Sequence, residues 1–518
     1  MASFRARNSA APLAAVAIAS VAGLVLSALL WSASRDRVHA SHFEGVMGTS
    51  LDIRVQARSD RAGLEAERVI LDEIRRESAI LSGYDPTSEF SRWMRSGGGP
   101  QKVSPELVAV LAAFDEWRER TGGALDPAVE TISQVWTRAA AEARLPSDAD
   151  LQMAVSAVRQ RHWMIDRAAS TVTRTSDAQV RLNSFTKSFI VDRAARRALA
   201  VSGVSGVMLN AGGDVVVRGD WTQTVGVADP VANADNAAPL GVLAVRDAVV
   251  ATSGGAKRGF EIGGRRYSHV LDPRSGQPAG HVASATVVSA DAIEAGALAT
   301  AFCVLTPAES AALARTRPGV AFSLVLEDGR KIDSDVWRQL DARPRPGPAL
   351  GGAIATLYAE QANWTPGSQL TVSLELARPG GMAKRPYVAV WIEDKDRFPV
   401  RTVALWYDGK ARYLPEMRAW SRADRLRSMA EGTQIVDAVT SATRQAGKYT
   451  LQWDGKDNAG KPVRPGTYTV CIEAAREHGS YQIIRQEMDL SGTAKHIALP
   501  GGTEISAADL DYQPSGSR

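Results

Sequence analysis

The pattern of apolar and polar positions begins with a long apolar run near the N-terminus. From Ala10 to Trp31 almost every residue is apolar or small, and Arg5 and Arg7 precede the run. Such a segment after basic residues is typical of an export signal, and it is also long enough to stay as a membrane anchor. We assign residues 1–40 to this signal peptide or membrane anchor, with Val38-His39-Ala40 as a candidate cleavage site. Cleavage and retention both remain open.

The following part of the chain mixes the two-residue period of strands with the 3.6-residue period of helices. A strand is expected around Leu51, Ile53 and Val55, which alternate with polar residues. Ser104 followed by Pro105 is typical of a helix start. The pattern also predicts a helix over 61–81, a strand running into a helix over 180–201, strands over 206–288 and a helix over 290–305. Such mixing without regular alternation favours an α+β domain, which we place at 43–341.

The pattern of apolar and polar residues changes beyond residue 341. A proline-rich segment at 342–352 is expected to be a stiff linker. Short alternating strands follow, and they predict an all-β, immunoglobulin-like sandwich over 353–510. The turn residues after Trp453 and the apolar alternation over 465–470 predict one hairpin of this sandwich.

Composition and charge exclude some classes of protein. The 518 residues include 61 Lys and Arg against 57 Asp and Glu, and these charges are spread thinly. Nothing in this distribution indicates a nucleic-acid partner. The two cysteines, Cys303 and Cys471, are interpreted as small buried hydrophobic residues rather than as a disulfide or a redox pair.

Two short segments carry most of the candidate chemistry. In 210–214, paired glycines would let a ligand approach the backbone, and Asp214 can take a hydroxyl or a cation. In 268–278, His269 precedes a rigid Asp-Pro-Arg-Ser-Gly turn, so that its imidazole and the Asp272 carboxylate could face one pocket. Each segment taken alone is more typical of an ordinary tight turn with a helix cap.

With six further motifs, these segments resemble the ApbE-like FAD:protein FMN transferases. The resemblance covers about residues 43–340, and all eight motifs follow the order of the family. The motifs are Met47-Gly48-Thr49, Gly83-Tyr84-Asp85-Pro86-Thr87-Ser88-Glu89, Gly123-Ala124-Leu125-Asp126-Pro127, Lys187 to Asp192, Asn210 to Asp214, Thr252-Ser253-Gly254, His269 to Pro278, and Glu294 to Ala301. The C-terminal part resembles exported sandwich domains of unknown activity that occur fused to such transferases.

The resemblance implies a function. Family members are exported, bind FAD with Mg²⁺, and transfer its FMN half to a Thr or Ser hydroxyl of a target protein, releasing AMP. A divalent cation suits the charge that develops on the leaving phosphate, and the weak hydroxyl nucleophile needs a base. The expected partners are FAD and an exported or membrane redox protein with a Ser/Thr-Gly-Ala-Thr motif, in the periplasm or at the inner membrane facing it. The alternative is a catalytically weakened flavin-binding or covalently flavinylated redox-carrier protein.

The resemblance also assigns residues to roles. The candidate catalytic residues are Lys187, Asp214, His269 and Asp272. The flavin pocket would include Met47, Tyr84, Ala124, Leu125, Asp126, Asn183, Phe189, Asp214 and His269. The metal would be bound by the Thr186 carbonyl, the Thr300 hydroxyl and the position of Gly296. A solvated helix lysine is the alternative for Lys187, and core packing is the alternative to flavin stacking for Tyr84 and Phe189.

Two departures from the family pattern bear on the metal site. The family usually has Asp-Ala-Leu-Ala-Thr where this chain has Gly296 to Thr300, so the carboxylate is missing. Glu294 lies roughly 200° around the helix from Gly296 and cannot simply substitute for it. Asp272 or the FAD phosphates are the candidates to complete the site. The second departure is 182–188, Leu-Asn-Ser-Phe-Thr-Lys-Ser, where the family more often has a glycine-rich loop.

The C-terminal part contains a candidate acceptor for flavin. Targets of FMN transferases typically show Asp, two residues, and then Ser/Thr-Gly-Ala-Thr, with the last Thr modified. The segment Asp437 to Thr443 is similar, but Ser441 replaces the glycine. Thr443 is therefore either a flavinylated residue or part of a plain polar loop.

Overall fold

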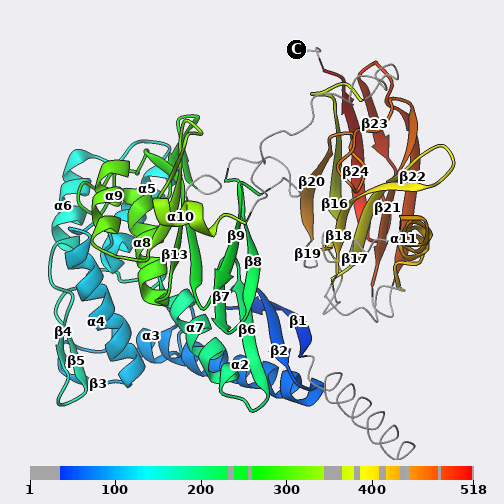
Figure 1. Cartoon of the computed structure of the whole chain (residues 1–518). Helices are drawn as coiled ribbons and strands as arrows, with labels where there is room; N and C mark the ends of the chain where they lie inside the picture. The colour runs from blue at the N-terminus through cyan, green and yellow to red at the C-terminus, as the bar shows by residue number, and fades with distance from the viewer. Residues whose placement is uncertain are drawn as a thin grey trace, which may run out of the picture.

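The structure is a computed structural model, and it describes residues 36–230, 239–254, 259–342, 364–378, 385–407, 416–431, 440–441, 444, 446–476 and 480–515 (Figure 1). The apolar run, the proline-rich linker and Thr443 lie outside the described residues. The described residues include the two turn segments 210–214 and 268–278, the predicted helices and most of the sandwich.

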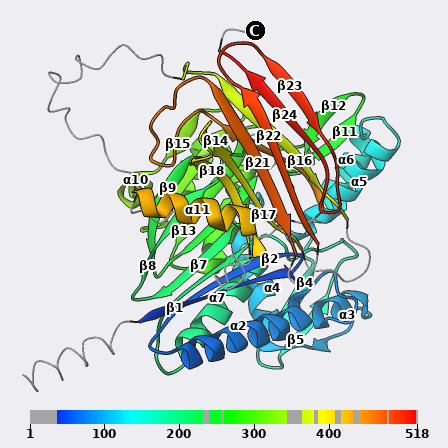
Figure 2. The same ribbon diagram turned by 90° about the vertical axis from the view of Figure 1, so that its right-hand side faces the viewer.

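An eight-stranded antiparallel sheet forms the centre of the N-terminal part, in the order β1-β2-β6-β7-β10-β13-β14-β15 (Figures 1 and 2). Its strands are β1 (Arg37–Val46), β2 (Thr49–Ala57), β6 (Val204–Ala211), β7 (Asp214–Gly219), β10 (Val249–Gly254), β13 (Val282–Ser289), β14 (Ala321–Leu326) and β15 (Lys331–Asp333). All eight positions of β13 are buried. The sheet is therefore covered on both faces at its centre.

Helices cover one face of this sheet. The three that pack on it are α2 (Asp60–Leu81), α7 (Thr186–Leu199) and α8 (Ala292–Val304). Around them lie α3 (Glu89–Arg95), α4 (Pro105–Arg120), the 3₁₀ turn η1 (Pro127–Val129), α5 (Glu130–Ala141), α6 (Asp148–Val158) and α9 (Pro307–Arg315), whereas α10 (Asp335–Leu340) packs on the opposite face of the sheet. The predicted start of α4 is confirmed, because Ser104 Oγ accepts a hydrogen bond from the Leu107 amide and Pro105 is the first residue of the helix. Cys303 is free and buried in this helical face, as expected.

Three small sheets complete the N-terminal part. They are formed by β3 (Gln101–Lys102), β4 (Trp163–Asp166) and β5 (Thr171–Arg174), by β8 (Thr222–Val227) and β9 (Gly241–Arg246), and by β11 (Gly259–Ile262) and β12 (Arg265–Ser268). Valines of β8 and β9 share a second core with Trp337 of α10 and with the valines of β7. This second core covers the face of the large sheet that the helices leave open.

The structure corrects two local expectations. The strand predicted before α7 does not form, because the Gln179 and Arg181 amides bond singly to Thr131 Oγ1 and Pro127 O instead of pairing with a strand. In addition, β1 was not expected. It pairs with β2 from Arg37 onward and so includes residues 37–40 of the segment assigned to the export signal.

The C-terminal part is the predicted all-β sandwich. One sheet contains β16 (Gln369–Leu376), β20 (Gly447–Trp453), β23 (Lys495–Leu499) and β24 (Ile505–Gln513), and the other contains β17 (Tyr387–Glu393), β18 (Pro399–Trp406), β19 (Thr440–Ser441), β21 (Thr467–Ala475) and β22 (Tyr481–Asp489). Alternate residues such as Val388 and Val390 face the core between the sheets. The intervening Ala389 and Trp391 pack with Trp420 of α11 (Arg418–Glu431), which covers the outer face of the five-stranded sheet.

The hairpin predicted after Trp453 is wrong. β20 pairs with β16 in one sheet, whereas β21 lies between β17 and β22 in the other. The turn residues between them close a small local turn, in which Asp457 accepts from the amides of Ala459 and Lys461. The connection therefore crosses from one sheet to the other. Among the described residues, no helix is both long and apolar enough to cross a membrane.

Candidate active site

The start of α7 meets the start of β7 at a buried carboxylate. Lys187 Nζ lies 3.2 Å from Asp214 Oδ2, and Ser188 Oγ donates to the same oxygen at 3.1 Å. Asp214 is buried and also accepts from the backbone of Thr252 on β10. Burial raises the pKa of the Asp214 carboxyl, and the Lys187 ammonium and the hydrogen bonds act in the opposite direction. The structure thus brings Lys187 and Asp214 together as an ion pair, so Lys187 is not a solvated helix lysine.

The paired glycines form the turn between β6 and β7. Gly212 and Gly213 both have positive φ, at 57° and 99°, as a two-residue antiparallel hairpin requires. A Cβ at Gly212 would lie 2.2 Å from Thr49 Oγ1, so the close approach here is to Thr49 rather than to a ligand. A Cβ at Gly213 would have nothing within 4 Å. Only Gly213 therefore leaves open space beside the turn.

Met47 lies in the neighbouring β1–β2 turn. It is half-buried and has a φ of 50°, an uncommon backbone conformation for a residue with a side chain. Because β2 pairs with β6 from Leu51 and Ala211 onward, this turn and the glycine turn lie at the same end of the sheet. Asp214 follows the glycine turn as the first residue of β7, so Met47 lies at the end of the sheet that carries the Lys187–Asp214 ion pair.

Tyr84 is an exposed aromatic side chain beside the loop that precedes α7. Tyr84 is 76% exposed. Its hydroxyl accepts a hydrogen bond from Asn183 Nδ2 at 3.1 Å, and the Arg181 guanidinium lies 5.5 Å from the centroid of its ring. Core packing is therefore excluded for Tyr84. Phe189 differs, because it packs against the hydrophobic core and lies beneath Arg193 at 5.5 Å.

The side chains of residues 124–126 are buried and make their contacts within the protein. Ala124 and Leu125 are buried in the core. Asp126 is also buried, and its carboxylate accepts from the Ala128 amide at 2.8 Å and pairs with Arg118 Nε at 2.7 Å. Any contact between this segment and a ligand would have to use its backbone.

Asp272 and His269 lie in different surroundings. Arg274 donates from Nε to Asp272 Oδ1 and from Nη2 to Oδ2, both at 2.9 Å, and the Arg274 amide also bonds Oδ1. Both oxygens of Asp272 are therefore engaged in closing the turn, which corrects the expectation that this carboxylate faces a pocket. His269 is exposed and directly follows β12.

At the expected metal site, the protein leaves no room for a side chain at position 296. A Cβ at Gly296 would lie 2.8 Å from both Cα and Cβ of Phe185, so α8 approaches the loop before α7 too closely for any side chain at this position. Thr300 Oγ1 donates to Ser184 O at 3.4 Å. Thr186 Oγ1 is buried and has no hydrogen-bond partner among the described residues. Magnesium prefers six oxygen ligands, usually with carboxylates among them.

No other described residues supply those ligands. Within the described ranges, no group of three or more His, Cys, Asp or Glu side chains could hold a metal ion. Ser289 and Arg317 donate to the two carboxylate oxygens of Glu294, so both oxygens already have partners. The residues present therefore do not fit a magnesium ion held by the protein.

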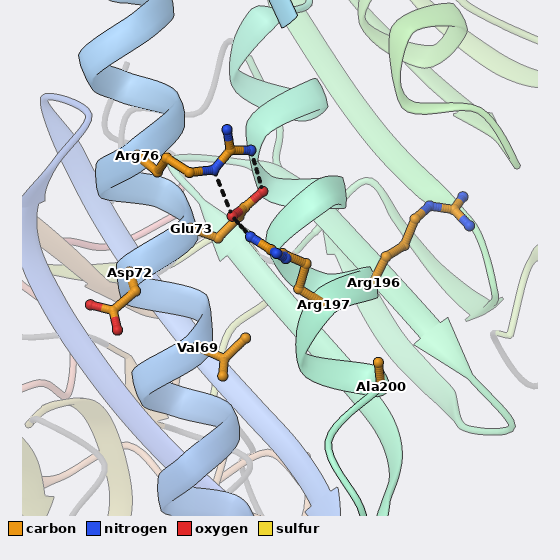
Figure 3. Close-up of a pocket in the computed structure, with 7 residues that line it drawn as sticks. All are labelled: Val69, Asp72, Glu73, Arg76, Arg196, Arg197 and Ala200. Atoms are coloured by element: carbon orange, nitrogen blue, oxygen red, sulfur yellow. Dashed lines mark hydrogen bonds and ion pairs between the residues drawn. The ribbon is translucent and has the colours of Figure 1, made fainter. Parts of the chain in front are cut away.

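A cavity of 530 Å³ lies elsewhere, between α2 and α7 (Figure 3). Glu73 stands at its centre, with Arg76 from its own helix and Arg197 from α7 bonded to its carboxylate. Its lining contains none of the residues expected to bind flavin. We interpret it as an ion-paired seam between two helices.

Sequence reasoning did not single out Phe185 or Arg274, and it noted Ser188 only as part of the departure at 182–188. Phe185 occupies the space beside Gly296 with its ring centroid 4.2 Å from that of Phe114, Ser188 bonds Asp214, and Arg274 holds Asp272. The signal for Ser188 was that it replaces a glycine of the family pattern, whereas Phe185 replaces another apolar residue and gave no such signal. The signal for Arg274 was its position two residues after an Asp that begins a turn.

Comparisons with known proteins extend these observations. A model described as the ApbE family matches residues 47–324, and a model described as a predicted periplasmic protein (DUF2271) matches residues 369–507. An FAD:protein FMN transferase of Treponema pallidum is 29% identical over 330 residues, which cover 58% of this chain and 90% of that protein. One of Salmonella typhimurium is 25% identical over 294 residues, covering 55% and 83%.

Solved structures of similar fold cover the same part of the chain. The ApbE protein of Thermotoga maritima superposes with a TM-score of 0.53 at 25% identity, over 59% of this chain and 100% of that one. The flavinyl transferase ApbE of Pseudomonas stutzeri superposes with a TM-score of 0.50 at 23% identity, over 59% and 98%. The expected α+β fold of the N-terminal part is thereby confirmed.

Proposed function

The chain belongs to the ApbE family, and from this premise we propose that it is an FAD:protein FMN transferase, which moves FMN from FAD to a Thr or Ser hydroxyl of a target protein. The observation that carries the proposal is the family match over residues 47–324, supported by relatives that are named for this activity. The Lys187–Asp214 ion pair lies within the matched residues, and it supports the start of α7 as the place of the active site.

The arrangement of side chains suggests how FAD would be held. The N-terminus of α7 presents free backbone amides next to the Lys187 ammonium, and both attract phosphate oxygens. The exposed ring of Tyr84 is available for the isoalloxazine to stack on, with Asn183 fixing its hydroxyl. The open space beside Gly213 adjoins Asp214.

The proton of the attacking hydroxyl needs an acceptor. Asp272 is engaged by Arg274, and Asp214 by Lys187 and Ser188. His269 is an exposed residue in the segment that carries the family motif. We assign the base to His269, because imidazole is the usual proton acceptor at neutral pH. The hydroxyl oxygen bonds the phosphorus of the FMN half, its proton passes to His269, and the bond to AMP breaks with AMP leaving.

Magnesium dependence, which the resemblance implies, finds no carboxylate support in this site. No step above runs through a metal ion for that reason. When bound, such an ion would neutralise charge on the diphosphate. The same absence favours the second candidate function, a flavin-binding protein with weakened transfer, because Phe185 closes the position where the family places its carboxylate.

The location and the acceptor are further parts of the proposal. The match of residues 369–507 to a predicted periplasmic protein supports work in the periplasm. We propose export by residues 1–40, a transferase domain over 43–341 and a sandwich over 353–510. The acceptor would be an exported or membrane redox protein with a Ser/Thr-Gly-Ala-Thr motif, and Thr443 of this chain is a second candidate acceptor.

The test is to incubate the purified chain with FAD and an acceptor bearing that motif, with and without Mg²⁺, and to follow AMP release and the acceptor mass. We expect AMP release together with a mass increase of one FMN. Lys187→Ala should slow release about 100-fold or more, by analogy with loss of one charged donor to a reacting oxyanion. Lys102→Ala, which changes an exposed lysine on β3, is the matched control.

The outcomes separate the two candidate functions. Tight FAD binding without AMP release or acceptor modification would leave only the flavin-binding function. An unchanged rate in Lys187→Ala would remove Lys187 from the site while leaving the transferase function intact. His269→Ala tests the base in the same way, and rescue of its rate by added imidazole would support the assignment.

A further inference from the structure

The sandwich contains a cavity of 360 Å³ beside α11. Three elements line it: α11, the end of β17 with the turn that follows it, and β22. The three elements lie together in both views of the chain (Figures 1 and 2). The volume falls within the range of sites for small molecules and is too small for a folded partner.

The lining of this cavity is strongly basic. It contains Arg397, Arg418, Arg422 and Arg485 against a single acidic side chain, Glu393. Arg397, Arg418 and Arg422 form no ion pair with an acidic residue in the described part of the chain. Concave sites lined by charges of one sign concentrate ions of the opposite sign. An anion is therefore the ligand that this lining favours.

The acidic groups at the base of the cavity already have partners. Glu393 is buried and accepts from Trp391 Nε1 at 2.8 Å. Beneath the lining, the fully buried Glu473 accepts from the amides of Ala419 and Trp420 at 2.9 and 2.7 Å. These bonds fix the start of α11, and with it the positions of the arginines that α11 carries. They leave the guanidinium groups without a carboxylate to bind.

An aromatic and apolar wall adjoins the arginines. The Arg418 guanidinium lies 5.5 Å from the centroid of the Tyr481 ring, and Tyr481 and Leu426 are 38% and 47% exposed. Partial burial and a hydrogen bond to Glu473 raise the pKa of the Tyr481 hydroxyl to about 12, so it remains uncharged. Exposed large apolar side chains are uncommon in this chain, and two of them line this one cavity. The ligand therefore has an organic part as well as an anionic one.

We propose that this cavity binds a small phosphate monoester, with the phosphate held by the guanidinium groups of Arg418 and Arg422 and the organic part lying against Tyr481 and Leu426. Guanidinium groups match the oxygens of a phosphate in pairs, and a dianion meets the excess of positive charge. The site lies wholly in the sandwich, so it does not depend on the transferase function proposed above.

The experiment is calorimetric titration of the full chain with inorganic phosphate, AMP and FMN in turn. We expect AMP or FMN to bind more tightly than inorganic phosphate. The variant Arg418→Ala/Arg422→Ala should weaken this binding at least tenfold, because each lost charged hydrogen bond is worth about 1.5–3 kcal/mol, a factor of ten or more. Arg425→Ala, an exposed arginine of α11 outside the lining, is the matched control and should bind as the unchanged protein does.

A second variant keeps the test valid if the double variant does not fold. Arg422→Lys retains the charge but not the paired donors, and it should weaken binding less than Arg422→Ala. FAD binding should stay the same in all of these variants, which separates this cavity from the flavin site. The proposal is overturned if none of the three ligands binds, if only inorganic phosphate binds, or if the arginine variants bind the esters as tightly as the unchanged protein.

Discussion

At the scale of single residues, Gly296 is in direct contact with the loop before α7. Gly296 allows α8 to approach the loop before α7, and Phe185 of that loop occupies the space that opens. The phenylalanine is completely buried, and its ring is tilted by 30° against that of Phe114, with the centroids 4.2 Å apart. A side chain at 296 and the backbone of Phe185 in its present place exclude each other. The missing carboxylate is therefore part of a packing arrangement rather than an isolated change.

We expect Gly296→Asp to destabilise the protein by about 1–3 kcal/mol, the usual cost of forcing extra atoms into a packed site. The new Cβ would meet Cα and Cβ of Phe185 at 2.8 Å, and these two atoms cannot turn aside as the end of a flexible side chain can. The measurement is the urea midpoint together with Mg²⁺-dependent AMP release. Gly280→Ala is the control, since a Cβ there has nothing within 4 Å.

Unchanged stability in Gly296→Asp, with much faster Mg²⁺-dependent release, would contradict this account. It would mean that α8 can move away from Phe185 and that the carboxylate alone limits the reaction. Loss of stability without a gain in release is the expected result.

At the scale of elements, the seam between α2 and α7 depends on a buried carboxylate. Hydrogen bonds from Arg76, with ion pairing to Arg197, lower the pKa of Glu73 to about 2 from an ordinary value of 4.5. The pKa of the folded state is thus below that of the unfolded chain. The contribution of Glu73 to stability is fully present above pH 4.5 and is lost as the pH falls toward 2.

We expect Glu73→Gln to be less stable than the unchanged protein by about 1–3 kcal/mol at pH 7, with the difference shrinking as the pH falls from 4.5 toward 2. Urea unfolding at pH 7, 4 and 3 measures it. Burial raises the pKa of the neighbouring Glu77, which acts with the opposite sign but is present in both proteins. Glu65→Gln is the control, because Glu65 pairs with Arg68 on an exposed face and should matter little at any pH. A difference that stays constant with pH would rule out ionisation of Glu73 as its cause.

At the scale of the whole molecule, the described hydrophobic clusters divide at the linker. One set draws all its residues from 43–340, and the other draws them from 364–512. Each set is large enough to support a folded unit of its own. The domain boundaries predicted from the change of texture at residue 341 agree with this division, and they remain a prediction until the two parts are separated.

We expect calorimetry to resolve two unfolding transitions. FAD at about 100 times its dissociation constant should raise only the transition of the N-terminal unit, by a few degrees, since ligand binding at that level adds about 2.7 kcal/mol. A chain truncated after residue 341 should show the FAD-sensitive transition alone. A single transition that shifts as a whole with FAD would show that the two units unfold together.

The sequence by itself determined the α+β and all-β parts, the helices α2, α4, α7 and α8 with the cap at Ser104, and the motifs that place the chain in its family. These follow from local periodicity, capping residues and short turns, which act over a few neighbouring positions. Strand pairing was harder to predict from the sequence. β1 was not predicted, and the two strands of the hairpin predicted after Trp453 lie in different sheets. Pairing depends on partners far away in the chain.

Only the tertiary structure decided which candidate side chains are available for chemistry. Asp272 and Asp126 lie in family motifs, yet Arg274 and Arg118 already bind their carboxylates. Gly296 departs from the family pattern, and Phe185 leaves no space for a side chain at that position. Lys187 and Asp214 were named separately, and the fold places them 3.2 Å apart. The arginines that line the cavity beside α11 likewise come from distant parts of the chain, as Arg397 and Arg485 show. A sequence motif records which side chains are present, whereas packing decides which of them already have a partner.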